Sequence, residues 1–290
     1  MIESALVYGL VNSLVILLTA LGFSLVFGLS GIANLAHGGL YIIAGYLTWI
    51  LLNRLHLPLG LSILLAIVVV ALCGGLLYRG VIQPIKGTTW SEVVSTYGIL
   101  VCIVEFFRWR GFITYEFSLP PFFKGGLEVL GVSLDYQRVA VVVLGALLLL
   151  GLYLFSHYNR VGLALRGMAQ DELTALSLGI EPNWTATISM ALGGALAAMA
   201  AVTLLPLGLI TVNLGYDILV VALAVSVLGG LESLAGLALA SLILGYAQIL
   251  VSTFVGSHWI EIVYLVAIIG VLIFKPSGLL GKFKELEERV

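Results

Sequence analysis

Charged residues are scarce in this sequence. Of its 290 residues only 10% are Asp, Glu, Lys or Arg, whereas 61% are hydrophobic, and the mean hydropathy is +1.17. Soluble globular domains carry about 25% charged residues, so this composition excludes that class. Apolar runs such as 59–77 and 139–155 are continuous rather than alternating, which excludes barrel strands. The sequence therefore predicts an all-α integral membrane protein, a polytopic helical bundle.

Motifs for ATP hydrolysis, metal binding and hydrolytic catalysis are missing. The sequence contains no G-x-x-x-x-G-K-S/T loop, so we do not expect this chain to hydrolyse ATP. H-E-x-x-H and G-x-S-x-G are absent too, and the four histidines are dispersed, which argues against an enzyme and a metal site. Both cysteines, Cys73 and Cys102, lie inside apolar runs, which favours buried thiols over a disulfide.

The hydrophobic runs predict eight to ten passes within a single transmembrane domain, residues 1–290. No basic n-region precedes the first run, which we expect to remain as a transmembrane helix. Residues 216–230 are short for a crossing and end in two glycines, so they form either a span or a re-entrant half-helix. The candidate spans are 5–29, 31–52, 59–79, 91–108, 138–156, 185–211, 216–230, 234–255 and 259–275.

The basic residues predict the orientation. Lys and Arg concentrate in cytoplasmic loops of membrane proteins. They occur here after the third span, in the loop 159–183 and in the tail, at Arg79, Lys86, Arg160, Arg166, Lys275, Lys282, Lys284 and Arg289. The loop 159–183 is therefore expected in the cytoplasm. The segment 109–137, which carries Pro120-Pro121 and Gly125-Gly126, is expected to form a compact loop on the periplasmic side.

The stretch GLSGIANLAHGGLYIIAGY (28–46) holds five glycines, Asn34 and His37 between apolar runs. Glycine lowers helix stability by about 1 kcal/mol relative to Ala, and lipid penalises the polar groups. The stretch is either an interrupted helix that faces protein or a water-filled path, or a tight polar turn at the membrane surface. Six of its residues recur with one gap about 200 positions later, from Gly230 to Tyr246; we favour chance similarity over a duplication.

The loop 159–183 contains an amphipathic pattern. Apolar residues fall on one side of a predicted helix over 163–178, at Leu165, Met168, Ala169, Leu173 and Leu176. Gly179 is a natural C-cap, and Pro182 prevents continuation. Such a helix lies on lipid headgroups or docks a soluble partner, and the pattern alone allows both.

Four segments in order carry a resemblance to a known family. They are 28–46, NRVGLALRGMAQDELTALSLGI (159–180), AVSVLGGLESLAGLALASLILG (224–245) and KPSGLLGK (275–282). Across essentially its full length the sequence resembles the permease subunits of branched-chain amino-acid-type ABC importers.

This resemblance implies a multi-pass permease in the inner (plasma) membrane of a prokaryote that imports a small polar solute by alternating access. It implies two ABC ATPase subunits that bind ATP and Mg, a second permease subunit, identical or homologous, and a periplasmic or extracellular solute-binding protein. It implies neither a cofactor in this chain nor a nucleic-acid partner. A stand-alone ion-coupled secondary transporter is the alternative, which the lack of a buried string of acids and bases weakens.

The resemblance also assigns roles to residues. The loop 159–180 corresponds to a coupling helix that docks on an ATPase, and its expected contacts are Arg166, Ala169, Asp171, Leu173, Ala175, Leu178, Gly179 and Ile180. Polar groups within apolar spans are candidates for the translocation path: Asn34, His37, Tyr41, Ser95, Thr96 and Tyr97. Gly39 stands where many family members have an acidic residue, so the resemblance does not fix a branched-chain amino acid as the cargo. The range of the family implies an amino acid, an amide, urea or a related small solute.

Overall fold

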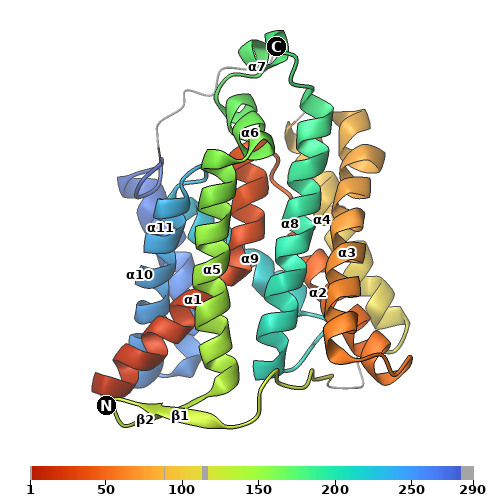
Figure 1. Cartoon of the computed structure of the whole chain (residues 1–290). Coiled ribbons are helices and arrows are strands. Elements are labelled where there is room, and N and C mark those ends of the chain that lie inside the picture. Colours follow the sequence, from red (N-terminus) through yellow and green to blue (C-terminus); the bar gives the residue numbers. More distant parts are fainter. Residues whose placement is uncertain (1, 88, 113–116, 282–290) are drawn as a thin grey trace.

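The computed structural model describes residues 2–87, 89–112 and 117–281, which form a bundle of long helices with one β-hairpin at its edge (Figure 1). Lys282, Lys284 and Arg289 of the predicted basic tail lie outside the described residues. The elements are α1 (Ile2–Ser30), α2 (His37–Asn53), α3 (Leu59–Leu77) with a π-turn (Tyr78–Ile82) and a 3-10 turn (Gln83–Ile85), α4 (Thr89–Trp109), β1 (Gly126–Val129), β2 (Val132–Asp135), α5 (Tyr136–Tyr158), α6 (Arg160–Gln170), α7 (Glu172–Ser177), α8 (Pro182–Leu204) with a 3-10 turn (Leu205–Leu207), α9 (Leu214–Gly229), α10 (Leu234–Phe254), a 3-10 turn (Ser257–Trp259) and α11 (Ile260–Phe274).

Seven helical stretches within the described residues are long and apolar enough to cross a membrane: 3–30, 59–85, 90–109, 136–158, 182–207, 234–254 and 257–274. The remaining apolar helices α2 and α9 have 17 and 16 residues. At about 1.5 Å per residue each is shorter than the roughly 30 Å hydrocarbon core. The all-α polytopic class is confirmed, and two of its helices are incomplete crossings.

Two predicted spans have the wrong limits because each runs into a break in the helical backbone. The predicted span 31–52 becomes helical only at His37, since residues 31–36 leave the helix and Gly31 has φ +66°. The predicted span 185–211 ends as an α-helix at Leu204, where Pro206 follows in a 3-10 turn. Asn34 and His37 are each only 1% exposed, so the surface-turn interpretation of the first break is wrong and the interrupted helix is confirmed.

The two half-helices meet at their N-termini. A Cβ added at Gly38 would lie 1.9 Å from the carbonyl oxygen of Gly215, and one added at Gly215 would lie 3.1 Å from the carbonyl oxygen of Gly38. From this meeting point α2 runs toward the end that carries the N-terminus and the hairpin, which we call the hairpin end. Helix α9 runs toward the opposite end, the α7 end (Figure 1). Only glycine permits this approach of two backbones.

The order of the elements repeats once along the chain, and the helices of the second set run in the opposite direction to those of the first. A long helix, a break, a half-helix and two further long helices follow one another in α1–α4 and again in α8–α11, with α5–α7 between them. Helix α1 packs along α10 as α8 packs along α3, and α1 crosses α8 where Gly22 meets Gly193. Inverted repeats are common in transporters. In this repeat the break at 31–36 corresponds to the break at 205–213. The sequence similarity of 28–46 to the stretch that begins at Gly230 does not follow this correspondence, because Gly230 lies in the turn between α9 and α10.

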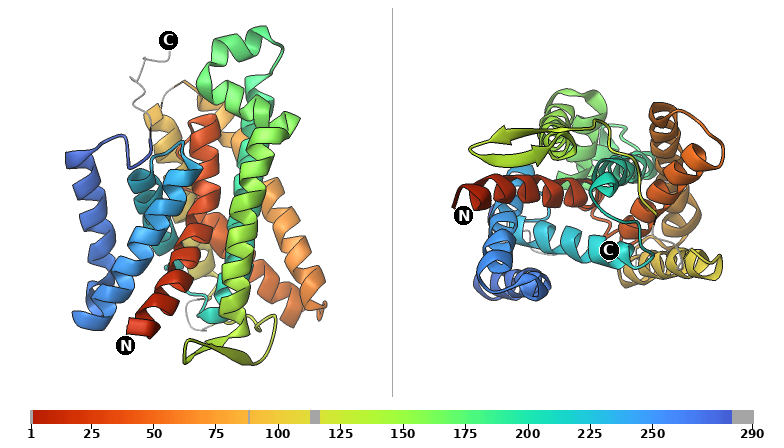
Figure 2. Two further views of the ribbon diagram at one scale, coloured as in Figure 1. Left: turned by 60° about the vertical axis from the view of Figure 1, so that its left-hand side comes forward. Right: turned by 90° about the horizontal axis from the view of Figure 1, so that it is seen from below.

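The two loops with predicted opposite locations lie at opposite ends of the bundle. Strands β1 and β2 pair antiparallel, with Gly126 opposite Asp135, and lie beside the N-terminus, whereas α6 and α7 lie at the other end (Figures 1 and 2). Arg79, Lys86, Arg160 and Lys275 belong to the α7 end. The hairpin end also carries basic residues, at Arg54, Arg110, Lys124 and Arg138, and which end faces the cytoplasm stays a prediction.

Candidate functional site

The α7 end carries two short helices where the sequence predicted one. Helix α6 stops at Gln170, and Asp171 is extended, with φ −154° and ψ 106°. The Asp171 carboxylate accepts hydrogen bonds from the backbone N–H groups of Leu173 (3.0 Å) and Thr174 (3.1 Å), so it is the N-cap of α7. The predicted continuous helix over 163–178 is therefore wrong, because this cap starts a new helix in the middle of the apolar pattern.

The end of α7 is as predicted. Gly179 has φ +83°, which favours glycine, and its N–H donates to the carbonyl of Leu176 (2.9 Å). The N–H of Ile180 donates to the carbonyl of Ala175 (3.1 Å). These two bonds form a Schellman motif, which satisfies carbonyl groups that the helix end leaves unpaired. Both ends of this six-residue helix are therefore fixed by local hydrogen bonds.

The helix pair is anchored to the membrane helices. Gly162 of α6 sits against the end of α5, where an added Cβ would lie 2.1 Å from the carbonyl oxygen of Phe155. Helix α6 also packs against α1 and α8, with Leu165 fully buried. The Lys86 ammonium lies 3.0 Å from the Glu172 carboxylate and ties α7 to the end of α3. The pair α6 and α7 is therefore connected to α1, α3, α5 and α8.

Three leucines of α7 and its cap face solvent: Leu173 is 79% exposed, Leu178 76% and Leu176 52%. We call them the α7 leucine patch. Of the eight predicted coupling residues, Leu173 and Leu178 present apolar surface, while Asp171 and Gly179 shape the helix ends. Ala175 is buried, and Arg166, Ala169 and Ile180 are half-buried. Sequence reasoning missed the Lys86–Glu172 pair, which joins residues far apart in the chain.

Polar side chains close the first break inside the bundle. Asn34 accepts a hydrogen bond from the N–H of Ala36 (3.2 Å), and the Thr96 hydroxyl of α4 accepts one from the N–H of Leu35 (3.2 Å). The Nε2 atom of His37 lies 2.9 Å from the carbonyl oxygen of Thr19, so this nitrogen carries the proton and donates. All three polar side chains are buried. They satisfy backbone groups that lipid could not.

The structure thus brings some predicted path residues together and separates others. Asn34, His37 and Thr96 surround the first break, and Tyr41 is buried one turn into α2. Ser95 is half-buried, and Tyr97 lies exposed on another face of α4. The four buried residues are enclosed by this single chain, so a solute would reach them only if the helices part. Their role in a path stays a prediction.

The second break, residues 205–213, is mostly apolar, and much of it is exposed. Asn213 precedes α9 and is exposed, and its side-chain oxygen accepts a hydrogen bond from the Arg108 guanidinium (3.0 Å). Arg108 also donates to the Glu105 carboxylate (2.5 Å). A backbone hydrogen bond fixes this break to the loop after α4, because the N–H of Ile210 donates to the carbonyl of Phe117 (2.7 Å). The i, i+3 spacing of Glu105 and Arg108 favours their pair, whereas the contact with Asn213 joins residues that are distant in the sequence.

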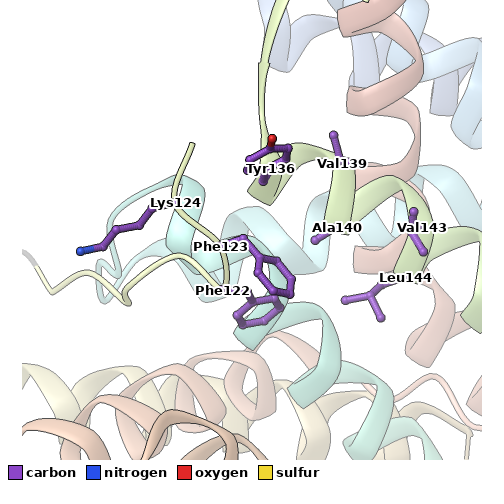
Figure 3. Close-up of a pocket in the computed structure, with 8 residues that line it drawn as sticks. All are labelled: Phe122, Phe123, Lys124, Tyr136, Val139, Ala140, Val143 and Leu144. Atoms are coloured by element: carbon purple, nitrogen blue, oxygen red, sulfur yellow. The ribbon is translucent and has the colours of Figure 1, made fainter. Parts of the chain in front are cut away.

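A separate hollow at the hairpin end does not resemble a polar path. It has a volume of about 750 Å³ and lies between the segment 122–124 and the start of α5 (Figure 3). The rings of Phe122 and Phe123 point toward α5, whereas Lys124 extends away from it (Figure 3). Apolar side chains such as Val139, Val143 and Leu144 make up the other wall. Within the described residues no group of three or more His, Cys, Asp or Glu side chains could hold a metal ion.

Comparisons with known proteins extend the structural result. Residues 5–273 match the family described as "Branched-chain amino acid transport system / permease component". The chain is 30% identical to the high-affinity branched-chain amino acid transport system permease protein BraD of Pseudomonas aeruginosa, over 96% of this chain and 95% of BraD. It is 27% identical to LivH of Escherichia coli K12, over 91% of each chain, and 29% identical to a probable LivH of Methanocaldococcus jannaschii, over 97% of this chain and 91% of that protein.

A solved structure shares the fold. A chain in the structure of PsaBC from Streptococcus pneumoniae in complex with Fab superposes with a TM-score of 0.51 at 15% identity, over 94% of this chain and 92% of that one. At this identity the likeness concerns the fold alone. The family match, by contrast, covers nearly all of the sequence, and the relatives are permease components of transport systems rather than enzymes. The chain is a multi-pass membrane protein that belongs to the branched-chain amino acid transport system permease family.

Proposed function

We propose that this chain is the permease subunit of an ATP-binding-cassette importer in the inner membrane of a prokaryote. Two ATPase subunits supply the energy, a second permease subunit completes the path, and a solute-binding protein delivers the cargo. The cargo is a small polar solute, in keeping with the amino acid transport named for the relatives. ATP and Mg bind to the partner subunits and not to this chain, whose sequence lacks a phosphate-binding loop.

The observation that carries this proposal is the α7 leucine patch. Three leucines stand exposed on α7 and its cap, and Figure 1 shows α7 beyond the ends of the long helices. Burial of a leucine side chain contributes about 1.5–3 kcal/mol, so a patch of this size suits a protein interface. The N-terminus and the hairpin lie at the opposite end, which would then face the periplasm and the solute-binding protein.

The connections of α6 support a mechanical role. Helix α6 packs against both α1 and α8, and each of these helices leads into a break. A shift of the docked α7 would therefore move the two long helices whose half-helix continuations meet at Gly38 and Gly215. Broken helices at a repeat interface commonly move relative to one another during alternating access. Closure of the ATPases would in this way open and close the bundle.

Replacement of Leu173 by Arg tests the docking role. Leu173 touches little of its own chain, so Leu173→Arg should leave the folded permease intact but place a charge in the interface. We expect recovery of ATPase subunits with the purified permease to fall about tenfold or more, and ATP-dependent uptake to be lost with it.

Leu55→Arg is the matched control. Leu55 is 60% exposed in the turn after α2 at the opposite end of the molecule, so the same change there should leave ATPase recovery unaltered. Full ATPase recovery and uptake with Leu173→Arg would refute the docking role. Uptake by the purified permease alone, driven by an ion gradient without any ATPase, would refute the importer.

A further inference from the structure

One face of the bundle combines polar groups from α4 and from the start of α9. Seen from the hairpin end, α9 runs beside α1, with α4 near one end of α9 and α11 near the other (Figure 2, right). Tyr97, Glu105 and Arg108 belong to one side of α4, at spacings close to whole helical turns. Asn213 and Tyr216 lie at the start of α9. An exposed polar face on membrane helices is costly in lipid and indicates water or another protein chain.

These side chains form one electrostatic cluster. Arg108 donates hydrogen bonds to Glu105 (2.5 Å) and to Asn213 (3.0 Å). The Tyr216 phenol is close enough to Tyr97, Glu105 and Arg108 to interact electrostatically with all three. The side chains of Arg108 and Glu105 are 40% and 50% exposed, so both charges are accessible from outside the chain. The two bonds occupy two of the five donors of the guanidinium.

Simple snorkelling to the membrane surface does not explain the direction of Arg108. Trp109 and Arg110 mark the end of α4, with the Arg110 guanidinium over the Trp109 ring at 5.8 Å. Arg108 instead binds Asn213, two residues before the Gly215 contact with Gly38 that joins the half-helices. A cation at a surface would extend toward the lipid headgroups. Arg108 is held toward the junction of the half-helices.

We propose that Glu105, Arg108 and Asn213 form a solute-contact site at the outer part of the translocation path, with Tyr97 and Tyr216 beside it. This inference rests on the proposed function. The site would take a dipolar solute, whose carboxylate binds Arg108 and whose ammonium group binds Glu105. A simple anion would be repelled by Glu105 and a simple cation by Arg108, whereas a zwitterion satisfies both charges. The second permease subunit would cover this face and enclose the path.

The accessibility of the pair suits transient binding. An exposed ion pair stabilises a fold little because water screens it, so opening it for a solute costs little. Arg108 keeps its orientation through Asn213 while a solute carboxylate takes free donors. A transport site must release its cargo as well as bind it, and a charge pair that water in the path screens does so readily.

A charge swap separates a binding role from a structural one. The double variant Glu105→Arg with Arg108→Glu preserves the ion pair at spacing i, i+3, the net charge, and a partner for Asn213, whose amide can rotate to donate. The permease, assembled with its ATPases and binding protein in proteoliposomes, is assayed for ATP-dependent uptake of L-leucine as a zwitterion and urea as an uncharged solute. We expect leucine uptake to fall about tenfold or more, with complex yield and unfolding temperature unchanged.

Three other results would count against the site. Leucine uptake within about twofold of the unmodified complex would show that the pair has only a structural or lipid-facing role, because the swap keeps both. Uptake of urea but not of leucine by the unmodified complex would overturn the zwitterion while ATP-driven import stands. A third result would overturn the proposed function, and the site with it. In this case neither the unmodified permease nor the double variant recovers ATPase subunits or shows ATP-dependent uptake.

Discussion

The two breaks in the bundle occupy equivalent places in the repeat but differ in their surroundings. At the first break, between α1 and α2, Asn34, His37 and Thr96 are buried and bonded to backbone groups. At the second break, between α8 and α9, Asn213 is exposed and bonded to the accessible Arg108. The polar residues of the first break stabilise the folded chain through buried hydrogen bonds. The polar residues of the second break are accessible from outside the chain.

Because of this difference in burial, substitutions at the two breaks should affect different properties of the protein. Removal of a buried hydrogen-bonding group leaves its partner unsatisfied, which costs about 1–3 kcal/mol. Removal of an exposed group costs little because water replaces it. Changes at the first break should therefore act mainly on folding, and changes at the second mainly on the solute.

The largest effect is expected at the junction that both breaks share. Gly38→Ala adds a methyl group 1.9 Å from the Gly215 carbonyl oxygen, and backbone cannot move aside cheaply. We expect a loss of about 2–3 kcal/mol of stability or more, seen as a lower unfolding temperature in detergent. Gly98→Ala in α4 is the control, because an added Cβ there meets nothing within 4 Å. Equal unfolding temperatures for the two variants would contradict the contact between the half-helices.

A smaller effect is expected for Thr96→Val, which keeps the shape of the side chain but removes the hydroxyl. The N–H of Leu35 loses one acceptor and the carbonyl of Ala33 a contact at 3.2 Å. We expect a loss of about 1–2 kcal/mol of stability, measured as a lower unfolding temperature, and uptake per folded complex close to that of the unmodified protein.

Asn213→Ala is the counterpart at the second break. Its side chain makes no capping bond to α9, so stability should change by no more than about 0.5 kcal/mol. Uptake should nevertheless fall, since Arg108 loses the group that orients it. A lower unfolding temperature for Asn213→Ala than for Thr96→Val would contradict the proposed difference between the two breaks.

Local signals in the sequence account for the parts of the structure that were predicted. Gly31, Asn34 and His37 are unusual in an apolar run, and they located the first break. Gly179 located the end of α7. Pro206 indicates the end of α8, which the structure confirms at Leu204. The predicted span 185–211 nevertheless extends past this break, because Leu207, Leu209 and Ile210 continue the apolar pattern. Asp171 was read as part of a helix for the same reason, since the apolar spacing continues across it.

The parts that could not be predicted depend on contacts between distant segments. Neither the meeting of Gly38 with Gly215 nor the bond from Arg108 to Asn213 follows from spacing along the chain. Burial is also a tertiary property: Thr96 and Tyr97 are neighbours in sequence, yet one is fully buried and the other is 45% exposed. Helical periodicity places them on different faces, but only packing decides which face is covered.

A photo-cross-linking side chain at position 173 tests the central claim most directly. The assembled transporter is irradiated and the cross-linked products are identified by mass spectrometry, with position 55 as the matched site at the hairpin end. If ATPases drive this permease through α7, position 173 yields an adduct with an ATPase subunit and position 55 does not. An ATPase adduct from position 55, or only lipid adducts from position 173, would contradict the account.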